Sequence, residues 1–185
     1  YIYFEILLPI YVKRYKIDLF LSPDGYIPTW GKTKTLPVIH DINYEHDPSF
    51  MGRKSYLRYY KHFFPIFAKK ATRVATVSEF SRRDIASVYQ IAENKIDVVY
   101  SAAKEEYKPC SKEEIVATKT RYTDSKDYFY FVGSLHKRKN LANLFRAFDL
   151  FKTETQSDVK LVIVGSKMWW KGEVAEAFEA MKYKD

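Results

Sequence analysis

Four residues with basic or titratable side chains lie between a predicted strand and a predicted helix: His136, Lys137, Arg138 and Lys139. The strand, residues 128–133, is apolar and rich in aromatic residues. The residues that follow the four repeat apolar side chains at helical spacing, which predicts one buried helix face over 141–151: Leu141, Leu144, Phe145, Phe148 and Phe151. Asn140 is in a favourable N-cap position.

A helix N-terminus offers unbonded backbone N–H groups and the positive end of the helix dipole. Side-chain cations beside it add to the attraction for an anion. The stretch 136–140 therefore predicts a phosphate or diphosphate site. A solvated loop between strand and helix, with lysines there by chance, is the alternative.

A second set of polar side chains follows the predicted strand 36–41: His40, Asp41, Glu45, His46 and Asp47. Their types would suit a metal ion, but their spacing fits no pair of ligands on a helix and no cysteine is near. The carboxyl end of a strand is also where α/β proteins place substrate contacts. Metal binding, substrate contact by His40 and plain loop chemistry all stay open at this point.

The predicted helix 53–70 mixes aromatic and basic residues, a pattern found at nucleic-acid and membrane surfaces. The alternative is that its aromatic side chains pack on a sheet while the lysines face water: Tyr56, Tyr59, Tyr60, Phe63, Phe64 and Phe67. Pro65 is expected to kink or break this helix near its last turns.

Two phosphate-binding motifs are absent. The segment 25–33 resembles a P-loop, but five residues separate Gly25 from Gly31 and a strand rather than a helix follows Thr33. No G-x-G-x-x-G follows any predicted strand, which argues against a dinucleotide-binding dehydrogenase.

The remaining pattern alternates strands and helices, which predicts an α/β fold with parallel sheets. Helices are expected at 1–15, 79–89 (capped by Ser78 or by a Ser81–Asp84 box), 111–122 and 172–183, and strands at 17–22, 73–78, 96–100 and 159–165. The last of these strands is a near-continuous apolar run, typical of a sheet covered on both faces, and a loop with Trp169 and Trp170 follows it.

The composition fits a folded protein of 185 residues, with 46% hydrophobic residues and a net charge of +8. This charge makes phosphate-bearing ligands, nucleic acid or an anionic membrane surface candidate partners without choosing among them. The single cysteine, Cys110, excludes an internal disulfide and fits a reducing compartment. The chain begins at Tyr1 and ends in a lysine-rich stretch, and we interpret it as a piece of a longer protein.

Five stretches stand in a fixed order along the chain: VIHD (38–41), ATVSEFSRRDI (75–85), IDVVYSAAKEEYKP (96–109), YFVGSLHKRKNLANLFRAF (130–148) and LVIVG (161–165). Together they resemble the motifs of the retaining glycosyltransferases of family 4 (glycosyl transferases group 1). The resemblance implies the GT-B fold: two Rossmann-like domains facing a cleft, both incomplete here. It implies an acceptor-side domain over 1–107, a linker over 108–127 and a donor-side domain over 128–185.

The resemblance also implies roles for single residues. Lys139 matches the basic residue that contacts the donor diphosphate, with Arg138 beside it and the backbone of Gly133 close to the donor. His40 matches the histidine that approaches the donor sugar, and its neighbour Asp41 is expected to orient it. Ser78 and Gly165 are expected to line the cleft.

Some positions depart from the family pattern. Ser134 stands where many members carry an arginine that contacts phosphate, and Ser101-Ala102 replaces the usual Asn-Gly of the crossover. The glutamate pair that members carry seven residues apart does not occur in this chain.

From the resemblance we expect a glycosyltransferase that moves a hexose from a nucleotide-diphosphate sugar to a hydroxyl acceptor with retention, in cell-surface polysaccharide or glycolipid synthesis. We expect no metal and no other cofactor, because cations can neutralise the leaving diphosphate. Expected partners are the nucleotide-sugar donor and a glycan or lipid-linked acceptor, with no nucleic acid. A cytoplasmic protein in peripheral contact with the inner face of the cell membrane is expected, and this chain alone should be inactive. The alternative function is a non-catalytic module that binds nucleic acid or an anionic membrane.

Overall fold

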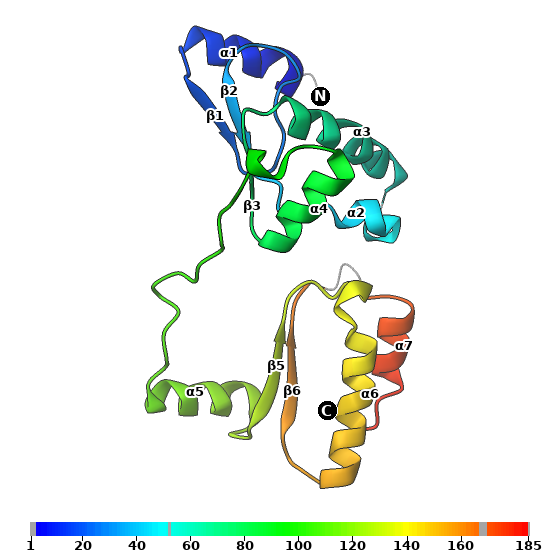
Figure 1. The fold of residues 1–185 in the computed structure, drawn as a ribbon. Helices are drawn as coiled ribbons and strands as arrows, with labels where there is room; N and C mark the ends of the chain where they lie inside the picture. Colours follow the sequence, from blue (N-terminus) through cyan, green and yellow to red (C-terminus); the bar gives the residue numbers. More distant parts are fainter. Residues whose placement is uncertain (1–2, 52, 167–169, 185) are drawn as a thin grey trace. The chain divides into compact units, whose positions relative to one another are not determined.

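The computed structural model describes residues 3–51, 53–166 and 170–184 and has an α/β fold, as the sequence predicts. The chain separates into two compact units, Tyr1–Lys104 and Glu105–Asp185, which are described one by one (Figure 1). The predicted limits 1–107, 108–127 and 128–185 stay a prediction about the domains of the whole protein.

The first unit begins with a π-helix, η1 (Tyr3–Leu7), which continues directly into the α-helix α1. Its α-helices are α1 (Leu8–Arg14), α2 (Asn43–His46), α3 (Lys54–Lys70) and α4 (Glu79–Tyr89). Its strands are β1 (Leu19–Ser22), β2 (Lys34–Pro37), β3 (Val74–Thr76) and β4 (Ile96–Val98), and two 3-10 turns complete it, η2 (Pro48–Phe50) and η3 (Glu93–Lys95). Each predicted helix and strand of this part is present, with strands two or three residues shorter than expected.

All the described strand pairs of this unit are parallel. β1 pairs with β2 and β3 with β4, and a single bridge from Val38 to Ala75 connects β2 to β3. Parallel pairing places the carboxyl ends of neighbouring strands at one edge of the sheet. His40, after β2, and Ser78, after β3, therefore lie at the same edge of this unit.

The core of the first unit explains why the aromatic helix α3 forms. Phe64 and Phe67 are buried, and Tyr60 and Phe63 are partly buried against the same core, whereas the Tyr56 side chain is 54% exposed. The packing alternative is therefore right for most of the predicted aromatic set and wrong for Tyr56.

The predicted break at Pro65 is wrong, because α3 continues to Lys70. Proline removes one helical hydrogen bond and is costly inside a helix. Phe64 and Phe67, on either side of the proline, are fixed in the core, and their burial offsets that cost.

The second unit contains the helices α5 (Lys112–Thr123), α6 (Leu141–Thr155) and α7 (Glu173–Glu179), a 3-10 turn, η4 (Lys137–Lys139), and the strands β5 (Tyr128–Val132) and β6 (Lys160–Val164). The two strands pair in parallel from Tyr128–Lys160 to Val132–Val164. The predicted apolar face of α6 is confirmed: Leu141, Phe145 and Phe148 are buried, and they pack with Val174 and Ala177 of α7. Trp170 packs against this cluster, while Trp169 lies outside the described residues.

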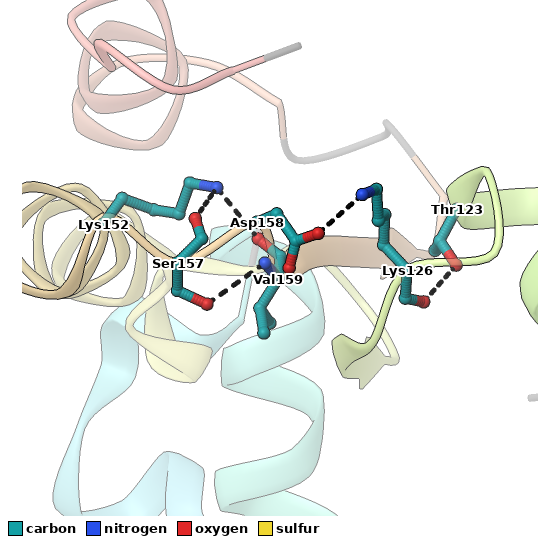
Figure 2. A network of polar contacts seen from close by, with 6 residues as sticks. All are labelled: Thr123, Lys126, Lys152, Ser157, Asp158 and Val159. Carbon is teal, nitrogen blue, oxygen red and sulfur yellow. Dashed lines mark hydrogen bonds and ion pairs between the residues drawn. The ribbon is translucent and has the colours of Figure 1, made fainter.

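A polar network at the amino ends of β5 and β6 joins the segment after α5 to this unit (Figure 2). The Lys126 ammonium pairs with Asp158 at 2.6 Å, and the buried Thr123 hydroxyl donates to the Lys126 carbonyl at 2.7 Å. On the other side of Asp158, Lys152 donates to the carbonyls of Ser157 and Val159. The end of α5 is thereby fixed to the strands that follow it.

The expectation that strand 159–165 is covered on both faces is wrong for the described residues. Leu161 and Ile163 pack on the helical cluster, but Val162 and Val164 face a hollow of about 440 Å³. Thr118 and Tyr122 of α5, with Tyr128 and Tyr130 of β5, complete its lining. The strand thus has one packed face and one open face.

Within the described ranges, no helix has the length and apolar character needed to cross a bilayer.

Candidate functional site

Two glycines meet where β5 and β6 end. The Gly133 N–H donates to the Val164 carbonyl at 2.9 Å, and Gly133 has a φ of +147°, a value that favours glycine. A Cβ atom on Gly165 would lie 2.0 Å from the Gly133 carbonyl oxygen and 3.0 Å from the Leu135 side chain. These predicted site residues are therefore in direct contact, and position 165 tolerates no side chain without moving the loop that starts at Gly133.

The loop continues into residues 136–140, which we call the basic turn. The imidazole Nδ1 of His136 accepts from the Arg138 N–H at 3.1 Å, and the His136 carbonyl accepts from the Lys139 N–H at 2.8 Å. The Lys137 carbonyl accepts from the Asn140 N–H at 2.9 Å. These bonds close the 3-10 turn that carries three cationic side chains in a row.

The lysine side chains of the basic turn are available to a ligand. Lys137 and Lys139 are exposed, and neither forms an ion pair with any residue that the structure describes. Arg138 and Ser134 are exposed as well. Three adjacent cations repel one another, so an anion placed between them would relieve that repulsion.

Helix α6 begins directly after the basic turn. Leu141 and Ala142 are buried in its first turn, and no acceptor for their backbone N–H groups occurs among the described residues. Asn140 occupies the N-cap position, but its side chain makes no capping bond, and its φ is +56°. Its carbonyl instead accepts from the N–H groups of Asn143 and Leu144. The predicted N-cap position of Asn140 is therefore confirmed, but its side chain makes no capping bond.

In the first unit, His40 follows β2 and is exposed. Its Nε2 lies 3.2 Å from the Pro23 carbonyl oxygen, an acceptor, so Nε2 carries the proton and Nδ1 carries the lone pair. The backbone beneath it is held by Thr76, a fully buried residue of β3 whose hydroxyl donates to the Ile39 carbonyl at 2.7 Å. The ring of His40 is thus oriented by Pro23 and its backbone by Thr76.

Residues 40–47 form what we call the polar segment, and its other side chains have structural partners. Asp41 accepts from the Asn43 N–H at 3.1 Å, and Asp47 caps η2 by accepting from the Ser49 N–H at 2.9 Å. The orientation of His40 by Asp41 stays a prediction, since the described contact of Asp41 is with the Asn43 N–H. Among residues 3–51, 53–166 and 170–184, no three His, Cys, Asp or Glu side chains converge as metal ligands would.

Two further contacts join the polar segment to the helices behind it. His46 Nε2 lies 2.9 and 3.0 Å from the two carboxylate oxygens of Asp84 on α4. The Lys61 ammonium of α3 lies 3.4 Å from the Glu45 carboxylate. The sequence offers a capping box between Ser81 and Asp84. In the structure, the Asp84 carboxylate bonds to His46 instead.

The actual cap of α4 is Ser78, which accepts from the Ser81 N–H at 3.1 Å. Ser78 is one of the two caps that the sequence offers for this helix, and its hydroxyl is already bonded in the structure. Its role in a cleft stays a prediction.

Tyr44 anchors the polar segment to the core. Its hydroxyl lies 2.6 Å from that of Tyr89 on α4, and both side chains are buried. Burial, followed by this hydrogen bond, raises the pKa of Tyr44 well above the usual range, and burial also raises the pKa of Tyr89. Both hydroxyls are therefore neutral, and the pair is a structural one.

Sequence reasoning named His136 only as part of the basic stretch and not as a cap, and it missed three residues that hold loops or backbone near the candidate side chains: Pro23, Thr76 and Glu5. Glu5 is buried and accepts from the Thr29 N–H at 3.0 Å, which fixes the loop that follows Pro23. None of these contacts has a local sequence signal, because each joins residues of different elements or uses an unusual capping residue. The structure gives the basic turn and the polar segment separately, so their expected meeting in a cleft stays a prediction.

Comparison with known proteins finds a family match within the second unit. Residues 112–184 match the family Glycosyl transferases group 1. The match covers the basic turn, both glycines and α6. This finding supports the predicted family at the level of its group 1 domain.

A relative supports the same assignment over more of the chain. The chain is 25% identical, over 159 residues, to "O-antigen chain mannosyltransferase B" of Escherichia coli, an alignment that covers 85% of this chain and 41% of that protein.

A solved structure, a glycosyltransferase from Rickettsia africae ESF-5, matches with a TM-score of 0.63 at 18% sequence identity. The match covers 94% of this chain and 45% of that one. At this identity the likeness shows the fold, which is consistent with part of a GT-B fold. The chain spans less than half the length of each of these proteins.

Proposed function

We propose that the protein is a retaining glycosyltransferase of family 4, which moves a hexose from a nucleotide-diphosphate sugar to a hydroxyl group of a glycan or lipid-linked acceptor. The observation that carries the proposal is the basic turn, where Lys137 and Lys139 are exposed, form no ion pair with any described residue and directly precede the N-terminus of α6. The group 1 match of this unit supports the reaction class, and the name of the Escherichia coli relative makes mannose the first sugar to test in surface polysaccharide synthesis.

The chemical task is to stabilise a leaving nucleoside diphosphate. As the glycosidic bond breaks, negative charge grows on the oxygen that leaves with the diphosphate. Lys139 and Arg138, next to the N-terminus of α6, would neutralise that charge where it develops. The Gly133 backbone and the exposed Ser134 would lie against the diphosphate on the strand side.

His40 would orient the sugar from the acceptor-side domain. Because Nε2–H is used by the Pro23 carbonyl, the lone pair of Nδ1 would accept a hydrogen bond from a sugar hydroxyl. Asp41, bonded to the Asn43 amide, would act on the sugar only through the shape of the polar segment.

Replacing Lys139 by alanine in the protein tests the proposal. Loss of one preorganised cationic contact should lower kcat by roughly 10²–10³-fold and weaken binding of GDP or UDP. Arg121→Ala is a matched control, because this exposed arginine belongs to α5, before β5. Unchanged turnover and unchanged nucleotide affinity in Lys139→Ala would contradict the proposal.

We also propose that no metal is needed, because the turn's cations would supply the positive charge. Turnover should survive a chelator. Loss of activity that Mg²⁺ or Mn²⁺ restores would contradict this part.

A cytoplasmic location with peripheral membrane contact is part of the proposal. Its support is the outer side of η1 and α1, where Ile6, Ile10 and Tyr11 are exposed just before Lys13 and Arg14. Apolar and basic side chains together favour an anionic bilayer surface. The protein should sediment with vesicles containing phosphatidylglycerol and not with pure phosphatidylcholine, and equal sedimentation with both would count against the charge argument.

The competing function, a nucleic-acid-binding module, is separated by a melting experiment. GDP- or UDP-sugars should raise the melting temperature, since a ligand that binds only the folded state stabilises it. Stabilisation by single-stranded oligonucleotide with steep salt dependence, and none by nucleotide sugars, would favour the competitor.

A further inference from the structure

The N-cap of the 3-10 turn η4 is His136, an unusual residue type for a cap. Side-chain caps are most often Ser, Thr, Asp or Asn. The comparable 3-10 turn in the first unit, η2, has an aspartate cap, with Asp47 bonded to the Ser49 N–H. In η4 the same bond, to the amide two residues later, is made by the ring nitrogen of His136.

The chemistry of the two caps differs in charge. Asp47 brings a negative charge to a turn that contains no cation, Pro48–Phe50. An aspartate at position 136 would stand next to Lys137 and two residues from Arg138, where it would attract the side chains that are exposed for an anion. A neutral imidazole accepts the hydrogen bond through the lone pair of Nδ1 without adding negative charge. It therefore caps the turn and leaves its positive charge undiminished.

We propose that His136 is a positioning residue of the diphosphate site, acting as a charge-neutral cap that sets the backbone of Arg138 and Lys139. Its ring holds the Arg138 amide at 3.1 Å, and its carbonyl holds the Lys139 amide at 2.8 Å. One residue thus fixes the backbone of the two cations assigned to the diphosphate. The inference rests on the proposed function, because it gives His136 a task only if the turn binds a diphosphate.

Three substitutions separate the cap from its charge. His136→Asn keeps a neutral acceptor, His136→Asp keeps an acceptor but adds a negative charge, and His136→Ala removes the acceptor. The dissociation constants of GDP and UDP are measured by calorimetry on the protein at 0.1 M and 1 M salt, with the melting temperature of each variant.

Each variant has its own expected result. The His136→Asn variant should bind within about twofold of the native protein, since asparagine is a good cap. Loss of the cap in the alanine variant should weaken binding by about three- to tenfold at both salt concentrations. The aspartate variant should bind about fivefold more weakly at low salt, and most of this deficit should disappear at 1 M salt, where the Debye length is about 3 Å.

A control removes a cap elsewhere in the same unit. Ser111 caps α5, accepting from the Glu114 N–H at 3.2 Å. Ser111→Ala should lower the melting temperature as His136→Ala does but leave nucleotide affinity unchanged. A purely structural role for His136 would make the two alanine variants alike in both measurements.

Native affinity in His136→Ala would overturn the inference, as would equal losses in His136→Asn and His136→Ala. An aspartate variant that binds as well as the asparagine variant would overturn the charge argument. If Lys139→Ala weakens nucleotide binding while all three His136 variants bind normally, only this inference fails. If the native protein binds neither nucleotide, the proposed function fails and the inference with it.

Discussion

The basic turn and the polar segment both follow the carboxyl end of a parallel strand, yet they use their side chains in opposite ways. In the polar segment, Tyr44, Glu45 and His46 each contact another element of the first unit. In the basic turn, the backbone and one imidazole make the internal bonds, and the lysines stay exposed. The polar segment is held in shape by its own side chains, whereas Lys137 and Lys139 of the basic turn are exposed and form no ion pair with any described residue.

The largest expected effect concerns the glycines at the two strand ends. Gly165→Ala places a methyl group 2.0 Å from the Gly133 carbonyl oxygen, and backbone cannot yield as a side chain can. We expect a loss of about 3 kcal/mol in the free energy of unfolding, the upper part of the overpacking range, and loss of nucleotide binding. Urea unfolding, monitored by circular dichroism, measures the free energy of unfolding.

Gly25→Ala is the matched variant in the first unit. Its Cβ would lie 2.9 Å from a ring atom of Phe64 and 3.3 Å from the Val38 carbonyl oxygen, contacts less close than the one at Gly165, although a φ of +81° adds strain. The Gly25→Ala variant should therefore lose less unfolding free energy than the Gly165→Ala variant. If the order of the two variants were reversed, the close approach of Gly133 and Gly165 would not be what holds the basic turn.

The next effect concerns the anchor of the polar segment. Tyr44→Phe leaves the buried Tyr89 hydroxyl without its partner and should cost about 1–3 kcal/mol of unfolding free energy. Thermal or urea unfolding checks the value, and Tyr56→Phe, at an exposed position of α3, is the control.

The same pair predicts a pH dependence. Burial raises the pKa of Tyr44 and Tyr89 in the folded state above the value of about 10 in the unfolded chain. Below that pH both states hold the protons and stability is constant. Above it the unfolded state loses protons that the folded state keeps, so stability falls as pH rises. Urea midpoints between pH 8 and 11 should show this fall, less steeply in Tyr44→Phe, and an equally steep fall in that variant would contradict the assignment.

Local pattern was enough to predict the elements of the fold. Apolar spacing along α6 and the run of apolar residues in β6 gave their type and approximate ends, because burial on one side sets a period. The errors fall where distant residues decide. Pro65 stays helical because the core holds its neighbours, and Val162 and Val164 line a hollow although the apolar run of their strand predicts burial.

The sequence predicted the charged residues of the candidate site but not the contacts that hold its loops in place. A row of lysines between strand and helix is visible in one dimension, and so are the glycines that end the strands. The contacts from His40 to Pro23 and from Ile39 to Thr76 join residues 17 and 37 positions apart, and no spacing rule connects them. Asp84 was predicted to close a cap and instead bonds to His46. Short polar side chains have several partners within reach, and only the folded chain selects one.

A smaller effect is expected at Thr76, which supports the backbone before His40. Thr76→Val keeps the volume but removes the hydroxyl that donates to the Ile39 carbonyl, which should cost about 1 kcal/mol. Turnover should fall through kcat more than through nucleotide affinity, because the basic turn is untouched. Thr118→Val is the control for the substitution type, since Thr118 is exposed and its hydroxyl forms no hydrogen bond with a described residue. Weakened GDP or UDP binding in Thr76→Val would contradict the separation of the two regions.

The smallest effect is expected at the contact between His46 and Asp84, the most exposed of the long-range contacts in the polar segment. The His46 side chain is 55% exposed, so water screens the interaction, and exposed pairs typically contribute about 0.2–1 kcal/mol. A double-mutant cycle with His46→Ala, Asp84→Ala and the double variant should give a coupling energy within this range. His62→Ala in α3, paired with Asp84→Ala in a second cycle, should give no coupling, because no contact between those residues occurs in the described structure. A coupling energy above about 2 kcal/mol at His46 would mean that this contact, and not the buried Tyr44–Tyr89 pair, fixes the polar segment, and the contrast with the basic turn would then rest on charge rather than on packing.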